Sequence, residues 1–312
     1  MLLKAARCLA LACAVAGCTK ETSSSSTDAA DVDSALPGQT ELPVVASPRW
    51  DSAFGSFIGF GADSELVVLL PTFTDSADTT ADASVVNSSR VDLFGLTGHI
   101  GSATVRGLGK AKNDEGCFEF SRGQIDSPRR GWSVAFPADK ASGVAVERLA
   151  SLHGPDSTQL ADLIKALAAT VPHAQDSIWR DWPINVEDAH RFTIPGANVV
   201  VGSTSRILPG GQHYAQKLFF VGERPETAAA ATPYRLAYSH STAAFGIDDE
   251  AISGLPFEDE AGVDAVVTTK ADSRPVILLE TRGNEVNGFA ALGRIAPGKW
   301  ALVWLGPHEG GC

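Results

Sequence analysis

The sequence is short of basic residues. Its 312 residues include 25 Lys and Arg against 37 Asp and Glu, which gives a formal net charge of −12. An acidic surface without a basic stripe repels phosphate backbones. The composition therefore argues against nucleic acid as a partner, and a solvated acidic surface explains the charge.

A long apolar run is also missing from the N-terminal region. The apolar stretch from Cys8 to Gly17 has about ten residues, whereas a membrane-spanning helix needs roughly 20. This length argues against a retained transmembrane anchor.

The common catalytic and cofactor-binding motifs are absent as well. The segment Gly55–Gly59 places its serine one position too early for a nucleophile elbow. His308-Glu309 lacks the second histidine of a zinc-protease motif, and the glycines before Lys110 lack the spacing of a phosphate-binding loop. No two of the seven histidines stand three or four residues apart. We therefore predict no catalytic residue, no metal site and no cofactor.

Two segments carry reactive side chains without the pattern that their chemistry requires. In Tyr238-Ser239-His240-Ser241, neighbours along a strand point to opposite faces, and serine–histidine catalysis needs a third, orienting group. The acidic stretch 248–260 offers carboxylates to calcium but lacks the alternating register that surrounds one ion. We favour a solvated acidic loop there, and calcium binding stays an open alternative.

What the N-terminus does contain is the pattern of a secretory signal peptide. Lys4 and Arg7 precede the apolar stretch, and small residues follow it. Loss of residues 1–17 takes the formal charge from −12 to −14, because Lys4 and Arg7 are removed and no acid is.

The junction Val15-Ala16-Gly17-Cys18 resembles the lipobox of bacterial lipoproteins, with valine where leucine is commoner. The resemblance covers this segment alone. It implies that Cys18 receives a diacylglyceryl group, that the chain is cut before it, and that the new amine is acylated. Two or more acyl chains hold a protein stably on a membrane, whereas one gives reversible attachment. The resemblance thus implies a lipid-anchored protein of the bacterial envelope, with its body outside the cytoplasm. An ordinary signal peptide that happens to precede a cysteine is the alternative.

The next segment, 18–47, has the composition of a flexible linker. It contains Ser23-Ser24-Ser25-Ser26, scattered acids and almost no aromatic residue, so it cannot bury enough apolar surface to fold. A linker of this length reaches about 30 Å on average.

From about Pro48 the sequence predicts a β-rich body. Short apolar runs alternate with the turn formers Gly and Pro, of which the chain has 30 and 17. The clearest runs are Phe57–Phe60, Leu66–Leu70, Arg90–Phe94, Ile100–Val105, Cys117–Phe120, Trp132–Phe136, Asn198–Leu208, Tyr214–Val221 and Tyr234–Ser239. The last four runs, Ala265–Thr269, Val276–Glu280, Gly288–Ile295 and Trp300–Leu305, are separated by tight turns and predict an antiparallel meander. We expect this C-terminal part to be a curled sheet or a barrel-like sandwich.

One amphipathic helix interrupts the strands. Asp156 and Gln159 form a capping-box-like start, and Pro172 marks the end. Leu160, Leu163, Ile164, Leu167, Ala168 and Val171 share one face at helical spacing. We expect this face to pack on the sheet as a brace, while Asp162, Lys165 and Ala169 point outward. A helix that serves a partner groove is the alternative.

Two cysteines remain once the signal segment is removed and Cys18 is acylated. Cys117 and Cys312 form an even pair in a compartment where disulfides persist. A bridge between them would join the C-terminal tail to the N-terminal β-rich part, with a chain-entropy effect of about 5 kcal/mol at most. Unpaired thiols or an intermolecular bridge are the alternatives.

The expected fold class is mainly β (α+β), with antiparallel sheets and one prominent helix. We expect a signal peptide at 1–17, the lipidated cysteine and linker at 18–47, a β-rich part at 48–150, the helical brace at 151–183 and an antiparallel part at 184–312. Residues 48–312 as one cooperative domain are an alternative. The leading hypothesis for function is a non-catalytic lipoprotein that binds a protein or small molecule or supports envelope structure. An enzyme with a cleft between the β-rich parts and a small-ligand carrier with an apolar cavity are the competing hypotheses.

Overall fold

A computed structural model describes residues 50–71, 82–109, 112–114, 117–175, 177–207, 214–245, 260–282 and 286–310. All of them belong to the second of two compact units, Val45–Cys312, the first being Met1–Val44. The expected signal segment and linker, Cys18, and residues 248–259 of the acidic stretch lie outside the described residues. No helix in the described ranges is long and apolar enough to cross a membrane.

The described body is mainly β, which confirms the expected fold class. Its first strands close into a barrel in the order β1-β6-β3-β2-β7. They are β1 (Ile58–Leu69), β2 (Arg90–Gly95), β3 (Gly98–Arg106), β6 (Arg122–Arg129) and β7 (Val134–Pro137). Closure removes open strand edges, and a hydrophobic cluster fills the barrel with aliphatic side chains from these strands and from the segments next to them, together with Phe57 and Trp132. The closed barrel thus forms in the earlier part of the chain, for which the sequence indicated strands but not closure.

The C-terminal meander is confirmed as the centre of an open sheet of seven antiparallel strands, in the order β4-β5-β17-β16-β15-β14-β8. Its strands are β4 (Lys112–Asp114), β5 (Cys117–Glu119), β8 (Ala141–Val144), β14 (Glu260–Thr269), β15 (Pro275–Arg282), β16 (Val286–Ala296) and β17 (Lys299–Gly310). The sheet draws strands from both β-rich ranges, 48–150 and 184–312.

A second open sheet has five antiparallel strands in the order β13-β12-β11-β10-β9. They are β9 (Glu147–Arg148), β10 (Asn185–Ile194), β11 (Ala197–Ile207), β12 (Tyr214–Pro225) and β13 (Arg235–Phe245). The chain leaves the seven-stranded sheet after β8, builds this five-stranded sheet, and returns at β14.

The expected helix is present as α1 (Pro155–Ala168), but its N-terminus differs from the expectation. The N-cap is Gly154 with Pro155 in the first turn, and no side chain caps the helix. Proline fixes the φ angle that a first helical residue needs, so Pro155 begins the helix where the capping box was expected at Asp156. The other helical segments are α2 (Ser177–Arg180) and the 3-10 helices Ser52–Phe54, Ala83–Val86, Leu149–Ser151 and Pro172–Gln175.

The apolar face of α1 packs on the five-stranded sheet. Leu160, Ile164 and Leu167 are buried as expected and share a core cluster with Val200 and Phe220 of that sheet. Leu163 is only partly buried, which corrects the expectation for that residue. Asp162 and Lys165 are exposed as expected, and Ala169 is intermediate.

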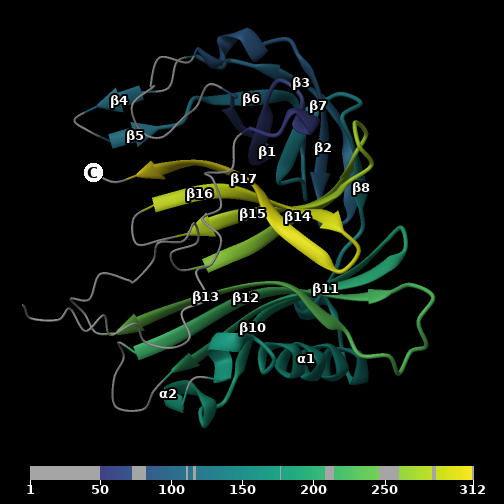
Figure 1. The fold of residues 1–312 in the computed structure, drawn as a ribbon. Coiled ribbons are helices and arrows are strands. Elements are labelled where there is room, and N and C mark those ends of the chain that lie inside the picture. Colours follow the sequence, from purple (N-terminus) through teal and green to yellow (C-terminus); the bar gives the residue numbers. More distant parts are fainter. Residues whose placement is uncertain are drawn as a thin grey trace, which may run out of the picture. The chain divides into compact units, whose positions relative to one another are not determined.

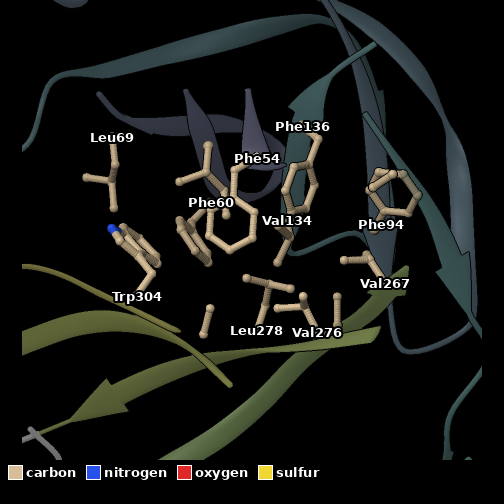
Figure 2. Packing of buried hydrophobic residues seen from close by; sticks show 14 of the residues in the cluster. Phe54, Phe60, Leu69, Phe94, Val134, Phe136, Val267, Val276, Leu278 and Trp304 are labelled. Carbon is tan, nitrogen blue, oxygen red and sulfur yellow. The ribbon is translucent and has the colours of Figure 1, made fainter. Parts of the chain in front are cut away.

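Three further hydrophobic clusters complete the packing. One fills the barrel, as described, and another joins the two open sheets through residues such as Val201, Val221 and Leu279. The last lies between the barrel and the seven-stranded sheet, where aromatic side chains of barrel strands meet aliphatic ones of β14 and β15 (Figure 2). The body is therefore layered as barrel, seven-stranded sheet, five-stranded sheet and α1 (Figure 1).

Candidate functional site

The three cysteines to which the sequence assigns a role lie at or beyond the limits of the described residues. Cys18 and Cys312 lie outside them, and only the backbone of Cys117, the first residue of β5, is described. The backbone nevertheless brings their neighbours together. Gly310 of β17, two residues before Cys312, is the strand partner of Phe118, the residue after Cys117.

The described surface contains an open depression between two β turns of the seven-stranded sheet. It has a volume of about 450 Å³ and is lined by residues 272–275, which lead into the start of β15, and by residues 294–297, at the end of β16. Its volume lies within the range of small-molecule sites, and two arginines lie in its wall. A ligand here would have to contact one of these guanidinium groups, so their existing partners decide what the depression can bind.

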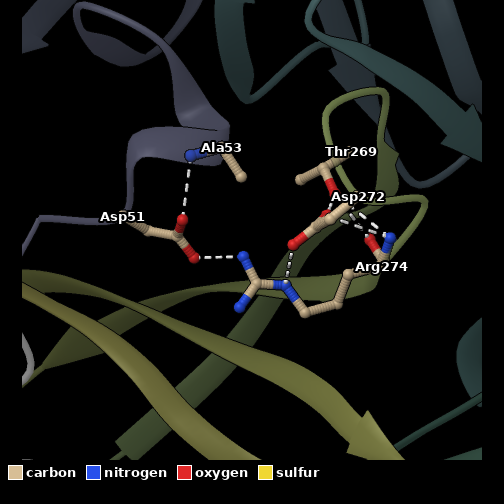
Figure 3. A network of polar contacts seen from close by, with 5 residues as sticks. All are labelled: Asp51, Ala53, Thr269, Asp272 and Arg274. Atoms are coloured by element: carbon tan, nitrogen blue, oxygen red, sulfur yellow. Dashed lines mark hydrogen bonds and ion pairs between the residues drawn. The ribbon is translucent and has the colours of Figure 1, made fainter.

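The guanidinium group of Arg274 is held by two carboxylates. Its Nη2 donates to Asp51 Oδ2, and its Nε lies 3.3 Å from Asp272 Oδ2. Asp51 also accepts a hydrogen bond from the backbone N–H of Ala53 at 2.9 Å, and Asp272 accepts one from the hydroxyl of Thr269 (Figure 3). Arg274 thus joins the segment before the barrel to the β14–β15 turn.

The guanidinium group of Arg294 is held by Glu223, which comes from β12 of the other open sheet. Its Nη2 and Nε donate to the two carboxylate oxygens at 2.6 and 3.0 Å. Glu223 also accepts from the backbone N–H of Gly298 at 2.8 Å and from Trp300 Nε1 at 3.0 Å. Burial opposes ionisation of Glu223, but these four donors keep its pKa below the usual value.

The charges around the depression are therefore already matched within the protein. Two guanidinium groups face three carboxylates, those of Asp51, Asp272 and Glu223. Because the carboxylates outnumber the guanidinium groups, the local charge does not favour an anionic ligand. The pairs Arg274–Asp51 and Arg294–Glu223 act as clamps, because each joins segments that are distant in sequence.

A second polar cluster lies at the β9 edge of the five-stranded sheet. His190 Nε2 lies 3.1 Å from Asp188 Oδ2, and Arg148 donates to the same carboxylate from Nη2 at 3.0 Å. Burial opposes ionisation of Asp188, but the hydrogen bonds from His190 and Arg148 lower its pKa to about 2. Because the carboxylate is ionised, Nε2 of His190 carries the proton in this contact.

The Asp188–His190 pair resembles half of a catalytic triad in composition only. His190 is 2% exposed, and its Nδ1 has no hydrogen-bond partner. A general base must come within hydrogen-bonding reach of the proton that it abstracts. The imidazole lies instead in the layer between the sheets, where a substrate in solvent does not reach it.

Arg206 of β11 is a buried cation that contacts carbonyl oxygens. Its Nη1 donates to the backbone oxygens of Ala174 and Trp179 at 2.8 and 3.0 Å, next to the two short helices around residue 175. Burial lowers the pKa of Arg206. This arginine fixes the short helices to the sheet.

The reactive-looking segment Tyr238–Ser241 lies in β13, the outer strand of the five-stranded sheet. Tyr238 packs edge-on against Phe219, with ring centroids 6.4 Å apart, and burial raises its pKa. His240 is 8% exposed. Alternation along the strand separates His240 from the serines on both sides, as the sequence predicts.

Sequence reasoning did not identify the polar clusters described above. Asp51 and Arg274, or Glu223 and Arg294, carry no common motif and stand far apart in the sequence. The one local signal was a charged residue inside an apolar run, as at Glu223 and Arg294, which marks a charge that needs a partner. Among the described residues no group of three or more His, Cys, Asp or Glu side chains could hold a metal ion. Comparison of the chain with family models, with curated proteins and with solved structures finds no match.

Proposed function

We propose that this protein is a lipid-anchored lipoprotein of the bacterial envelope whose β-rich body is a non-catalytic binding or structural module. The observation that carries the proposal is the junction Val15-Ala16-Gly17-Cys18, placed directly after two cations and a short apolar stretch. An acylated Cys18 would supply the membrane attachment that such a short stretch does not.

The body supports the non-catalytic part of this proposal. The buried Glu223 and the partly buried Asp188 and Arg274 are each held by partners within the protein. Catalytic groups, by contrast, are usually exposed to a cleft and keep a hydrogen-bonding atom for the substrate. The ion pairs Glu223–Arg294 and Asp51–Arg274 fix the sheets and the segment before the barrel relative to one another. A scaffold or binding module requires such a rigid arrangement.

We further propose the bridge between Cys117 and Cys312 as part of the same envelope protein. The pairing of Gly310 with Phe118 supports it, since consecutive Cα atoms are about 3.8 Å apart and a disulfide needs Cα atoms about 4.4–6.8 Å apart. Two residues of chain from Gly310 are enough to cover this distance.

Acyl labelling tests the anchor. In a bacterial host fed a labelled fatty acid, the wild-type chain should carry label and partition into detergent, while Cys18→Ser should do neither. Cys13→Ser is the matched control, because it removes a cysteine from the segment that is cut away and should leave labelling intact. A Cys18→Ser chain that is still labelled and membrane-bound would contradict the proposal.

A further inference from the structure

Among the described residues, no further strand pairs with the outer edge of the five-stranded sheet. Strand β13 pairs with β12 alone in the strand order of the described residues. It has 11 residues, whereas the other terminal strands of the two open sheets are short: β9 has 2 residues, β4 has 3 and β8 has 4. Short edge strands offer few backbone groups to another chain, and a long one offers many.

Strand β13 also lacks the side chains that protect an edge. From Leu236 to Phe245 it contains no charged residue, no proline and no glycine. The opposite edge, β9, carries two charged residues in ion pairs, Glu147 with Arg191 and Arg148 with Asp188. Proteins normally use such charges to prevent strand addition. Apart from Arg235, its first residue, β13 lacks such charges, which favours an edge that is used for pairing.

The backbone of β13 is regular over most of its length. Tyr238–Phe245 pairs without interruption with Tyr214–Val221 of β12, and a bulge follows between Val221 and Gly222. This leaves an uninterrupted stretch of about 27 Å for another strand.

The sequence of β13 fits a second copy of itself. Around His240, two pairs of residues at equal distances are identical, Ser239 with Ser241 and Ala237 with Ala243, and the pair between them, Tyr238 with Thr242, consists of two uncharged hydroxyl residues that favour strands. When two copies of a strand pair antiparallel about a two-fold axis at one residue, a residue that precedes the axis in one copy faces the residue that follows the axis by the same number of positions in the other copy. With the axis at His240, each serine meets a serine and no like charges oppose each other, which favours a second copy over an unrelated strand.

We propose that two copies of this chain pair antiparallel through β13, with the two His240 residues at the two-fold axis. The central pairs are Tyr238 with Thr242 and Ser239 with Ser241. The two five-stranded sheets then form one continuous sheet across the dimer. This interface does not depend on the lipid anchor, so it is tested in the full-length Cys18→Ser chain, where failure of the anchor proposal has no effect.

Sedimentation equilibrium over a wide range of protein concentration measures the interface. We expect a dimer whose dissociation constant rises about tenfold or more in Ser239→Lys/Ser241→Lys, because lysines then oppose each other at two positions. The matched control, Ser127→Lys/Thr227→Lys, adds the same charge at exposed positions outside β13 and should leave the dimer unchanged. A monomer at every concentration, or equal dissociation constants in the two variants, would overturn the proposal.

Hydrogen exchange of the unsubstituted Cys18→Ser chain provides a second measurement that does not depend on folding of the lysine variant. Amides of Tyr238–Thr242 should exchange more slowly at high than at low protein concentration, since pairing protects them. If the exchange rates of these amides are the same at both protein concentrations, β13 does not pair with a second copy, and the proposal fails.

Discussion

Helix α1 rests on two glycines of the five-stranded sheet, and this contact allows a quantitative test of the layered packing. A Cβ atom on Gly202 of β11 would lie 2.9 Å from both Cδ1 and Cγ2 of Ile164, and 2.7 Å from Cζ of Phe220. A Cβ on Gly222 of β12 would lie 2.6 Å from Cδ1 of Leu167. The helix therefore comes as close as it does because neither strand carries a side chain at these points.

Two single substitutions should each destabilise the protein for opposite reasons. Ile164 is 0% exposed, so Ile164→Ala removes buried methyl groups and leaves a cavity, which should cost about 2–5 kcal/mol. Gly202→Ala adds a methyl group where there is no room, which should cost about 1–3 kcal/mol. In the double variant the new methyl group occupies part of the cavity, so the loss should be smaller than the sum by at least about 0.5 kcal/mol.

Urea unfolding of the full-length Cys18→Ser chain and its three variants measures this coupling. Lys165→Ala is the control on the exposed face of α1 and should change stability by no more than about 0.5 kcal/mol. Leu163→Ala should cost less than Ile164→Ala, because Leu163 is only partly buried. Strictly additive losses, or a Gly202→Ala variant as stable as its parent, would refute the close packing of α1 on β11.

Three further predictions concern the polar clusters and the cysteines. Alkylation of the denatured protein without reductant should leave Cys117 and Cys312 unmodified; labelling of both would show that they are not bridged. Glu223→Gln should cost about 3–5 kcal/mol in urea unfolding, since Arg294 then lies partly buried without its carboxylate, and a loss below about 1 kcal/mol would contradict the clamp. The lowered pKa of Asp188 means that the unfolded chain binds its proton first as the pH falls, so this group stabilises the fold above about pH 4 and the effect is lost towards pH 2. Asp188→Asn should therefore reduce the fall in unfolding free energy between pH 5 and pH 2 by about 2 kcal/mol, and an unchanged fall would be evidence against the Asp188 contact.

The sequence predicted elements whose signal is local. Apolar runs bounded by turn formers indicated the strands of the meander, and the 3.6-residue period indicated α1 and most of its buried face. Barrel closure was not predicted, because β1 pairs with β6 and β7, and strand periodicity says nothing about which strands meet. Leu163 shows a similar limit. Helical periodicity identifies the centre of the apolar face, but it does not show how far the sheet extends under the edge of that face, where Leu163 lies partly buried.

The polar clusters escaped prediction for a related physical reason. Asp51 and Arg274 stand 223 positions apart in the sequence, and only the tertiary fold brings them together. The predicted N-cap of α1 at Asp156 was wrong because the sequence contains two competing start signals. Pro155 in the first turn outweighed the acceptor side chain of Asp156 that follows it.

The strand order of the seven-stranded sheet has a consequence for how the protein is made. β4, β5 and β8 precede the whole five-stranded sheet in the chain, yet β5 pairs with β17 and β8 with β14. A polypeptide that emerges N-terminus first from a ribosome or translocase therefore exposes these early strands long before their partners exist. Non-local strand pairing is slow, and unpaired edges aggregate during the delay. Biogenesis should accordingly depend on a holding chaperone, and a nascent chain arrested before β14 should be degraded rather than accumulate as a partial body.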